Sequence, residues 1–576
     1  MPRLVSIAAV LIAFLPASLA AQDAAAPSSR SAQAAPAVLA RHGMVASQEK
    51  RASEIGVDIL RRGGNAVDAA VAVGFALAVT LPRAGNLGGG GFMLVHLSRR
   101  HQSIAIDYRE TAPAATTSDV FLDQNGEADP ARSRDSGLGV GVPGTVAGLA
   151  LAHRRYGSGR FTLAELIAPA IRLARAGVPV EDDLLDTLTL LGGRLVRWPS
   201  SARIFGHADG TPLTAGDQLM QVDLAETLEA IARQGPSAFY RGPIADKLVA
   251  GVRTAGGLMT REDLRDYRAV VRPPVHGRYR GRTILSMSPP SSGGVHLVEM
   301  LNILERFPLR SLGAGSPAAL HLMIEAMKLA YADRAEYLGD SDMVNVPLTR
   351  LLSKRYAATL AAQIDPERAR PARDIRPDSR ALHDGANTTH FSVVDRFGNA
   401  VANTYSLNFN YGLGLVADGT GVLLNNTLDD FAAKPGAPNA FGLVGSAANA
   451  PGPRKRPLSS MTPAIVLARG RPVLVTGAPG GSRIITSVLQ VIVNTIDFAQ
   501  PVAEAVAAPR VHHQWMPDHV VVEPGLASAT SEALRRRGHD VRIGPAAGSA
   551  NSIAVTPAGL VGAADARVRG GLAAGY

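Results

Sequence analysis

The sequence contains no cysteine, which excludes disulfide frameworks, thiolate nucleophiles, zinc ribbons and iron–sulfur clusters. A covalent catalyst in this chain is therefore a Ser, Thr, Lys, His or carboxylate side chain. Lysine is also scarce, at 6 of the 59 basic residues, so the net charge of +10 comes mainly from arginine. The basic runs 454–456 and 535–537 are short and have no aromatic RNA-binding motif beside them. We therefore expect no nucleic-acid partner.

Long apolar runs are lacking as well. The run Leu4–Leu15 at the N-terminus is shorter than the ~20 residues that a membrane-spanning helix needs. Arg3 before this run and the small residues around Ala20 after it are typical of a secretory signal peptide. We predict a signal peptide over 1–20 and a disordered, Ala/Pro/Ser/Gln-rich linker over 21–40. The mature protein is then expected to be periplasmic or secreted, with no membrane span.

The remaining composition is that of a globular protein. Of the 576 residues, 46% are hydrophobic and 19% are charged, which allows two to four domains or one large domain. Ser47 is predicted to cap a helix that runs to about Arg62, and Asn65 with Asp68 to cap a second, buried helix to about Val79. Further helices are expected near 144–155, 163–176, 223–234, 243–255, 294–306 and 317–336.

The pattern changes at Thr388. Residues 388–395 alternate like a half-buried strand, 396–399 form a turn, and 400–407 return as a second strand. The polar stretch 363–387 before them is predicted to be an exposed connector. Further strands are expected near 421–425, 462–468 and 473–476, followed by a helix over about 483–498. The carboxy-terminal third is thus predicted to be a layered α/β or α+β structure.

Several local motifs carry little chemistry by themselves. Ser47 begins an S-x-x-K pattern, but its companion motifs are absent and a helix cap explains the serine. The glycine-rich loop 85–91 lacks the features of a P-loop or a dinucleotide fingerprint. His512 and His513 are adjacent and therefore point apart, which favours a structural role over metal binding.

Two features are suggestive. Residues 479–483 join an expected strand to an expected helix, and the free N–H groups of such a turn can stabilise an oxyanion. A plain tight turn explains them equally well. If the chain were cut before Thr388, its α-amino group, with a reference pKa near 8, could accept the proton of its own hydroxyl. From the residues alone, an ordinary strand threonine is the favoured interpretation.

A resemblance to a known family changes that balance. Residues 387–395, followed by 398–401, resemble the processing site of the γ-glutamyltranspeptidases, which are self-cleaving N-terminal-nucleophile hydrolases. The resemblance covers the chain from about 43 to 576. It is carried by further motifs at 63–70, 85–92, 107–110, 404–408, 423–431, 456–463 and 476–483.

The resemblance implies an αββα sandwich of the α+β class, cut between Asn387 and Thr388. The large subunit, 41–387, and the small catalytic subunit, 388–576, would stay together as a heterodimer that needs no metal or organic cofactor. Thr388 would attack the γ-carbonyl of glutathione or another γ-glutamyl donor. The acyl group would then pass to water or to an amino acid or peptide acceptor.

The resemblance also implies the roles of the remaining site residues. Gly480 and Gly481 would supply the oxyanion-hole N–H groups, and Ser406 would support the amine of the nucleophile. On the substrate side, Arg109 with Ser459 and Ser460 would bind the donor α-carboxylate, and Asp430 with Asn408 would bind its α-ammonium group.

At two positions expected near the bound substrate, this sequence has a different residue from the one that the family usually has. Thr427 stands where the family usually has Glu or Gln, so we expect weaker glutamyl binding or an altered donor preference. Phe441 replaces a Tyr that is common in bacterial relatives, within a lid over about 435–445, and we expect a looser lid that favours bulkier donors. Two alternatives stay open: an acylase of the same fold that cleaves glutaryl or other acyl amides, and a processed but catalytically weak binding protein.

Overall fold

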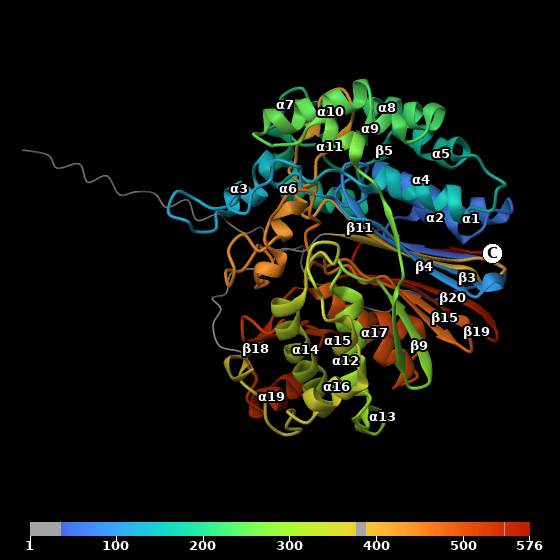
Figure 1. The fold of residues 1–576 in the computed structure, drawn as a ribbon. Coiled ribbons are helices and arrows are strands. Elements are labelled where there is room, and N and C mark those ends of the chain that lie inside the picture. Colours follow the sequence, from blue (N-terminus) through green and yellow to red (C-terminus); the bar gives the residue numbers. More distant parts are fainter. Residues whose placement is uncertain (1–35, 376–387, 546–547) are drawn as a thin grey trace, which may run out of the picture.

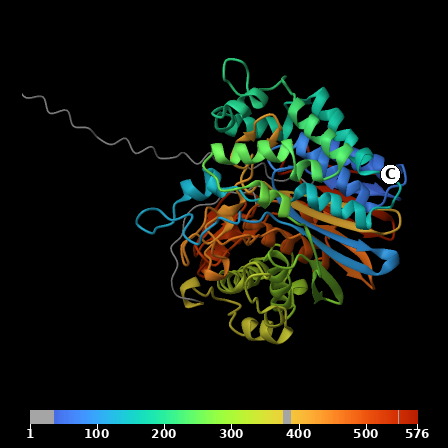
Figure 2. The same cartoon turned by 45° about the horizontal axis from the view of Figure 1, so that its top comes forward.

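The computed structural model describes residues 36–375, 388–545 and 548–576. The chain forms four layers, in which two seven-stranded sheets lie face to face and helices cover the outer side of each (Figure 1). The same layering is visible after rotation (Figure 2). The expected αββα sandwich is confirmed. The predicted signal peptide and Asn387 lie outside the described residues.

The first sheet has the strand order β21-β2-β10-β11-β3-β4-β7, and all its neighbours are antiparallel. Its strands are β2 (Met44–Ser47), β3 (Gly90–Leu97), β4 (Gln102–Tyr108), β7 (Val270–Arg272), β10 (Thr389–Val394), β11 (Ala400–Ser406) and β21 (Leu572–Gly575). The hairpin β10–β11 was predicted from its alternation and turn. It occupies the middle of the sheet, so both its strands have a neighbour on each side and are buried.

The second sheet has the order β1-β20-β19-β15-β14-β9-β8. Its strands are β1 (Val38–Ala40), β8 (Val275–Tyr279), β9 (Arg282–Ser286), β14 (Ala464–Ala468), β15 (Arg471–Thr476), β19 (Asn551–Thr556) and β20 (Gly559–Ala564). Strand β1 corrects the prediction of disorder up to residue 40. Val38 to Ala40 pair with Leu560 to Gly562, so the edge of a distant strand orders residues whose local composition predicts no structure.

Helices pack on the outer side of the first sheet. They are α1 (Lys50–Arg61), α2 (Ala66–Thr80), α4 (Thr145–Tyr156), α5 (Leu163–Ala176), α6 (Asp182–Val196), α7 (Pro199–Phe205), α8 (Val222–Gln234), α9 (Ser237–Tyr240), α10 (Pro243–Thr254) and α11 (Arg261–Asp266). Helix α2 is buried along its whole length, and Asn65 and Asp68 form the predicted capping box. The predicted cap of α1 is wrong: Ser47 ends β2, and the carboxylate of Glu49 caps the helix by accepting from the Ala52 N–H.

A second group of helices covers the outer side of the other sheet. They are α12 (Gly293–Leu304), α13 (Leu309–Leu312), α14 (Pro317–Tyr337), α15 (Leu348–Leu351), α16 (Lys354–Ala361), α17 (Arg483–Ile496), α18 (Val502–Ala507) and α19 (Ser528–Arg536). One apolar core fills the space between the two sheets and continues between the second sheet and these helices. A second core lies between the first sheet and the helices that cover it. No helix within the described residues is long and apolar enough to cross a membrane.

Short elements complete the fold. They are α3 (Pro130–Arg134), β5 (Val178–Pro179), β6 (Gln218–Leu219), β12 (Val416–Ala417), β13 (Val422–Leu423), β16 (Val511–His512), β17 (Val520–Val522), β18 (Val541–Ile543), η1 (Ser98–Arg100), η2 (Gly137–Gly139), η3 (Ala372–Asp374), η4 (Thr427–Asp430) and η5 (Ala447–Asn449). The strand expected near 421–425 is only β13.

Most of the described part of the predicted connector, residues 363–375, is exposed as expected, but Ile364 and Ala372 are buried. The Ala372 N–H donates to Asp518, and its carbonyl accepts from the Trp515 indole at 3.0 Å. The Lys328 ammonium donates to the Arg370 carbonyl at 2.8 Å. Polar composition predicted exposure here, but these long-range partners satisfy the backbone and bury Ala372 completely.

Candidate active site

The candidate nucleophile lies at one end of the two central strands. Thr388 immediately precedes β10, and Ser406 is the last residue of β11. Because Thr389 pairs with Tyr405, the next position along this antiparallel ladder brings Thr388 opposite Ser406. Both residues line one cavity, whose wall is made of Arg109, Thr388, Ser406, Asn408, Asp430, Phe441, Leu443, Ser459, Ser460, Met461, Gly481, Ser482 and Ile484.

The glycine pair lies between β15 and α17, as the sequence predicted. Gly480 has a φ of 134° and Gly481 a φ of 53°, values that residues with a Cβ rarely adopt. Their carbonyls accept the first N–H groups of α17, from Arg483 and Ile484. Among the described residues no backbone carbonyl accepts the N–H of either glycine. Gly481 lies in the wall of the cavity that contains Thr388, and Gly480 directly precedes it. Free N–H groups in such a turn can stabilise an oxyanion.

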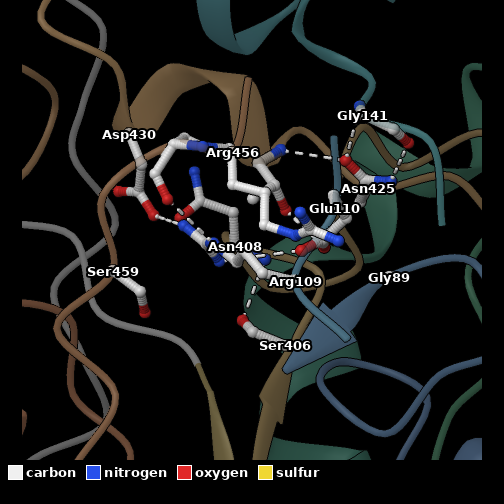
Figure 3. A network of polar contacts seen from close by, with 12 residues as sticks. Gly89, Arg109, Glu110, Gly141, Ser406, Asn408, Asn425, Asp430, Arg456 and Ser459 are labelled. Carbon is white, nitrogen blue, oxygen red and sulfur yellow. Dashed lines mark hydrogen bonds and ion pairs between the residues drawn. The ribbon is translucent and has the colours of Figure 1, made fainter. Parts of the chain in front are cut away.

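Opposite charges meet at the polar end of the cavity. Arg109, directly after β4, is 1% exposed and forms an ion pair with Asp430 through Nη2, while its Nε donates to the Pro457 carbonyl at 3.2 Å. Figure 3 shows Asp430 and Ser459 on the same side of the Arg109 side chain. Burial raises the pKa of Asp430, and the attraction of Arg109 opposes that shift. A zwitterionic ligand could bind between the two residues, with its negative group on Arg109 and its positive group on Asp430.

Asn408 and Ser406 are coupled by a local turn. The Asn408 N–H donates to the Ser406 hydroxyl at 2.8 Å, and its side-chain amide donates to the Asn426 carbonyl at 3.1 Å. Asn408 has a φ of 80°, and asparagine tolerates this left-handed region better than most residues. The turn places both polar side chains in the wall of the cavity.

Ser459 and Ser460 approach the cavity from the other sheet. Their loop is held by the residues before α12: the Ser459 N–H donates to the Pro290 carbonyl, and the Ser292 N–H to the Ser459 carbonyl, both at 2.8 Å. The Ser459 hydroxyl accepts the Met461 N–H at 3.1 Å. The predicted carboxylate-binding residues Arg109, Ser459 and Ser460 thus share the cavity wall.

Thr427 is placed differently from its expected role. Its side chain is fully buried and is not part of the cavity wall. The Thr427 hydroxyl instead donates to Glu110 Oε1 at 2.7 Å, and Glu110 Oε2 lies 3.7 Å from Arg109 Nη1. Burial raises the pKa of Glu110, although Arg109 and the Thr427 hydroxyl both favour its charged form. Thr427 is therefore connected to the cavity wall through Glu110 and Arg109.

Phe441 closes one side of the cavity and is 3% exposed. Its ring stacks on Phe409 with centroids 5.0 Å apart and an angle of 6° between the planes. Its carbonyl accepts the Gln514 side-chain amide at 3.0 Å. Phe441, the residue of the predicted lid that lacks the tyrosine hydroxyl, is therefore held by an aromatic stack and a backbone contact.

Comparison with known proteins identifies the family. The family profile of gamma-glutamyltranspeptidase matches residues 52–575. The chain belongs to the γ-glutamyltranspeptidase family. It is 52% identical to a glutathione hydrolase proenzyme of Escherichia coli (strain K12), over 94% of this chain and 93% of the relative. It is also 40% identical to the acylase ACY 1 proenzyme of Pseudomonas sp. (strain SE83), over 92% of each.

Solved structures agree with that assignment. The crystal structure of cephalosporin acylase from Bacillus halodurans superposes with a TM-score of 0.79 at 28% identity, over 98% of this chain and 99% of the other. The fold of this γ-glutamyltranspeptidase family member is thus one that glutathione hydrolases and acylases share.

Some residues around the site had no clear signal in the sequence. Glu110 could have been suspected because it follows Arg109 directly, and Phe409 because it follows Asn408. Gln514 and Arg334 reach the site only through tertiary packing. The sequence correctly favoured a structural role for His512, whose Nδ1 lies 2.9 Å from the Thr486 hydroxyl.

A histidine–carboxylate cluster lies away from this cavity. The potential ligand atoms of His321, Glu325 and His539 lie within 4.8 Å of one another, and no ion is present. His321 Nδ1 is 2.7 Å from His539 Nε2, and the Lys328 ammonium donates to Glu325 at 2.8 Å. The two histidines contact each other and Glu325 accepts from Lys328, and we assign the cluster no metal.

Proposed function

We propose that this protein is a γ-glutamyltransferase and glutathione hydrolase, made as a precursor that cuts itself between Asn387 and Thr388. The observation that carries the proposal is the pairing of Arg109 with Asp430 in the cavity wall that also contains Thr388. Such a pair offers one charge to each end of an amino-acid head group. The 52% identity to a glutathione hydrolase proenzyme supports the same substrate class.

In the proposed reaction, the Thr388 hydroxyl attacks the γ-carbonyl carbon while its proton passes to the Thr388 α-amine. The resulting oxyanion accepts hydrogen bonds from the N–H groups of Gly480 and Gly481. Collapse of this intermediate breaks the amide bond, and the α-ammonium returns the proton to the leaving amine. Ser406, opposite Thr388 on β11, supports the amine.

The acyl-enzyme ester is then resolved by the same steps in reverse order. Water or the amine of an amino acid or peptide gives up a proton to the Thr388 α-amine and attacks the ester carbonyl. Thr388 leaves and regains its proton. Arg109, Ser459 and Ser460 hold the donor α-carboxylate throughout, and Asp430 with Asn408 holds its α-ammonium group.

We propose that the precursor is exported through a signal peptide over 1–20.

The first test is a denaturing gel of the purified protein. Wild type should give two fragments, 21–387 and 388–576, with lengths in a ratio of about 2:1. Thr388→Ala should give one unprocessed band, because the attacking hydroxyl is missing. A single uncut band from an active wild type would contradict the mechanism.

A second candidate function is an acylase for glutaryl amides. The 40% identity to an acylase proenzyme and the position of Thr427 outside the cavity wall favour it, since a donor without an α-amine would not need a contact there. Turnover of a γ-glutamyl anilide and of its glutaryl counterpart separates the two. We expect the γ-glutamyl donor to react faster; faster glutaryl cleavage would select the acylase. Intact processing with turnover of neither would indicate a binding protein.

A further inference from the structure

Arg334 is a buried cation directly behind the two serines of the candidate carboxylate site. It lies on α14 and is 5% exposed. Its Nη2 donates to the Ser460 hydroxyl at 3.3 Å, and its Nε donates to the Ser292 hydroxyl at 3.0 Å. No carboxylate of the described residues lies within ion-pair distance of this guanidinium. Asp430 acts on it only from farther away, and burial lowers the pKa of Arg334.

The contacts of Arg334 constrain the hydrogen bonds of the serine pair: Ser460 accepts from it, and Ser459 is held through Ser292. Ser292, which accepts from Arg334, donates its own hydroxyl proton to the Ser459 carbonyl at 2.8 Å, so one guanidinium reaches both residues of the serine pair. The Ser460 oxygen already accepts an N–H from Arg334. Within the described parts of the chain its O–H has no acceptor, although the side chain is 8% exposed and lines the cavity.

An anion in the cavity would satisfy both groups. A hydroxyl that accepts from a guanidinium has its proton left for a second partner, and a carboxylate can only accept. A buried cation without a counter-ion is costly unless an opposite charge comes close. Glu110 and Asp430 form ion pairs with Arg109, the other cation of the site, whereas none of the carboxylates that the structure describes pairs with Arg334.

We propose that Arg334 is a positioning residue for donor recognition: it fixes the Ser460 hydroxyl as a donor, holds the backbone of Ser459 through Ser292, and adds a second positive charge behind the donor α-carboxylate. This inference rests on the proposed γ-glutamyltransferase function. It predicts that the benefit of Arg334 depends on the α-carboxylate, not on the scissile amide or the α-amine.

The test compares two donors in wild type, Arg334→Met and Arg334→Lys. The γ-glutamyl p-nitroanilide carries the α-carboxylate, and the 4-aminobutyryl p-nitroanilide lacks it. Arg334→Met should raise KM for the γ-glutamyl donor about ten-fold, the order expected for a lost charged hydrogen bond, with kcat little changed. KM for the 4-aminobutyryl donor should stay within about two-fold. Arg334→Lys keeps the charge but cannot donate to Ser292 and Ser460 in the same planar geometry, so its KM for the γ-glutamyl donor should rise by an intermediate amount.

The exposed Arg355 on α16 supplies the matched control, and Arg355→Met should leave both donors unchanged. Equal losses on the two donors, or a loss confined to kcat, would overturn the inference. If Arg334→Met is not processed, Arg334→Lys decides by the same donor comparison. A processed wild type that cleaves neither donor would overturn the proposed function, whereas an active wild type with donor-independent losses overturns only the role of Arg334.

Discussion

At the scale of single residues, the buried hydroxyl of Thr427 is linked through Glu110 to Arg109, the predicted ligand of the donor α-carboxylate. Thr427 is bonded to Glu110, and Glu110 is next to Arg109 in space as well as in sequence. The sequence could show that Thr427 departs from the family pattern. It could not show that the side chain turns away from the cavity, because that depends on Glu110, which is 317 positions distant.

Thr427→Gln should restore a side chain long enough to reach the donor α-amino group. We expect KM for the γ-glutamyl anilide to fall several-fold, while KM for the glutaryl anilide, which has no α-amine, does not fall. Thr427→Ser keeps the hydroxyl and serves as the control. Steady-state kinetics on both donors checks this, and an unchanged γ-glutamyl KM in Thr427→Gln would count against it.

Asp429 gives the fold a predicted dependence on pH. Burial raises the pKa of Asp429 to about 7, and its carboxylate contacts the Ser133 hydroxyl. The unfolded chain releases this proton near pH 3.8, so between pH 4 and 7 the folded state binds more protons than the unfolded state. The free energy of unfolding should therefore fall as pH rises through this window.

Asp429→Asn should remove that contribution, because an amide does not ionise. Urea unfolding at pH 5.5 and pH 8 measures the difference for each protein. We expect the loss of stability between these two values to be smaller in Asp429→Asn than in wild type. An identical change in both proteins would show that another group is responsible.

At the scale of elements, the helices and the central hairpin could be predicted from local sequence. The segments of the chain that pair or pack with one another could not. The helices capped by Asn65 or bounded by glycine appear close to their expected limits, because caps and periodicity are local signals. Strand β1 and the packed part of the connector depend on pairing with residues far along the chain. Local composition carries no information about such partners.

The predicted lid over 435–445 contains Phe441, whose ring stacks on Phe409, and we predict that its closure depends on this stack. Phe409→Ala removes the stacking partner outside the lid and should loosen it. We expect the ratio of kcat/KM for a donor with a bulky leaving group to that for a compact donor to rise. Phe441→Tyr, which keeps an aromatic ring at the stack, is the control and should change the ratio less. A ratio unaffected by Phe409→Ala would show that the stack does not limit access.

At the scale of the whole molecule, the two predicted subunits share both sheets. Strands β10 and β11 of the small subunit lie between β2 and β3 of the large subunit, and β21 of the small subunit forms the edge beside β2. In the other sheet, β1 and β9 of the large subunit flank four strands of the small one. The chain length alone allowed several domains. Because strands from both sides of the predicted cut alternate in both sheets, the two segments form one folding unit.

The processed protein should therefore unfold as one body. Size-exclusion chromatography in increasing urea should show the fragments together until the helical circular dichroism signal is lost, because separating them breaks both sheets. Thr388→Ala, in which the fragments are still joined, gives the reference transition. Separation of the fragments before the loss of helix would contradict a shared core.

The predicted cut within one polypeptide also has a consequence for how the two subunits are produced. Each precursor delivers one copy of the central hairpin and one copy of the strands that border it. A cell that makes this protein would obtain its two components in equal number from a single translation event, and neither would wait for the other with an uncovered sheet edge. Balanced production thus requires no separate control of two genes.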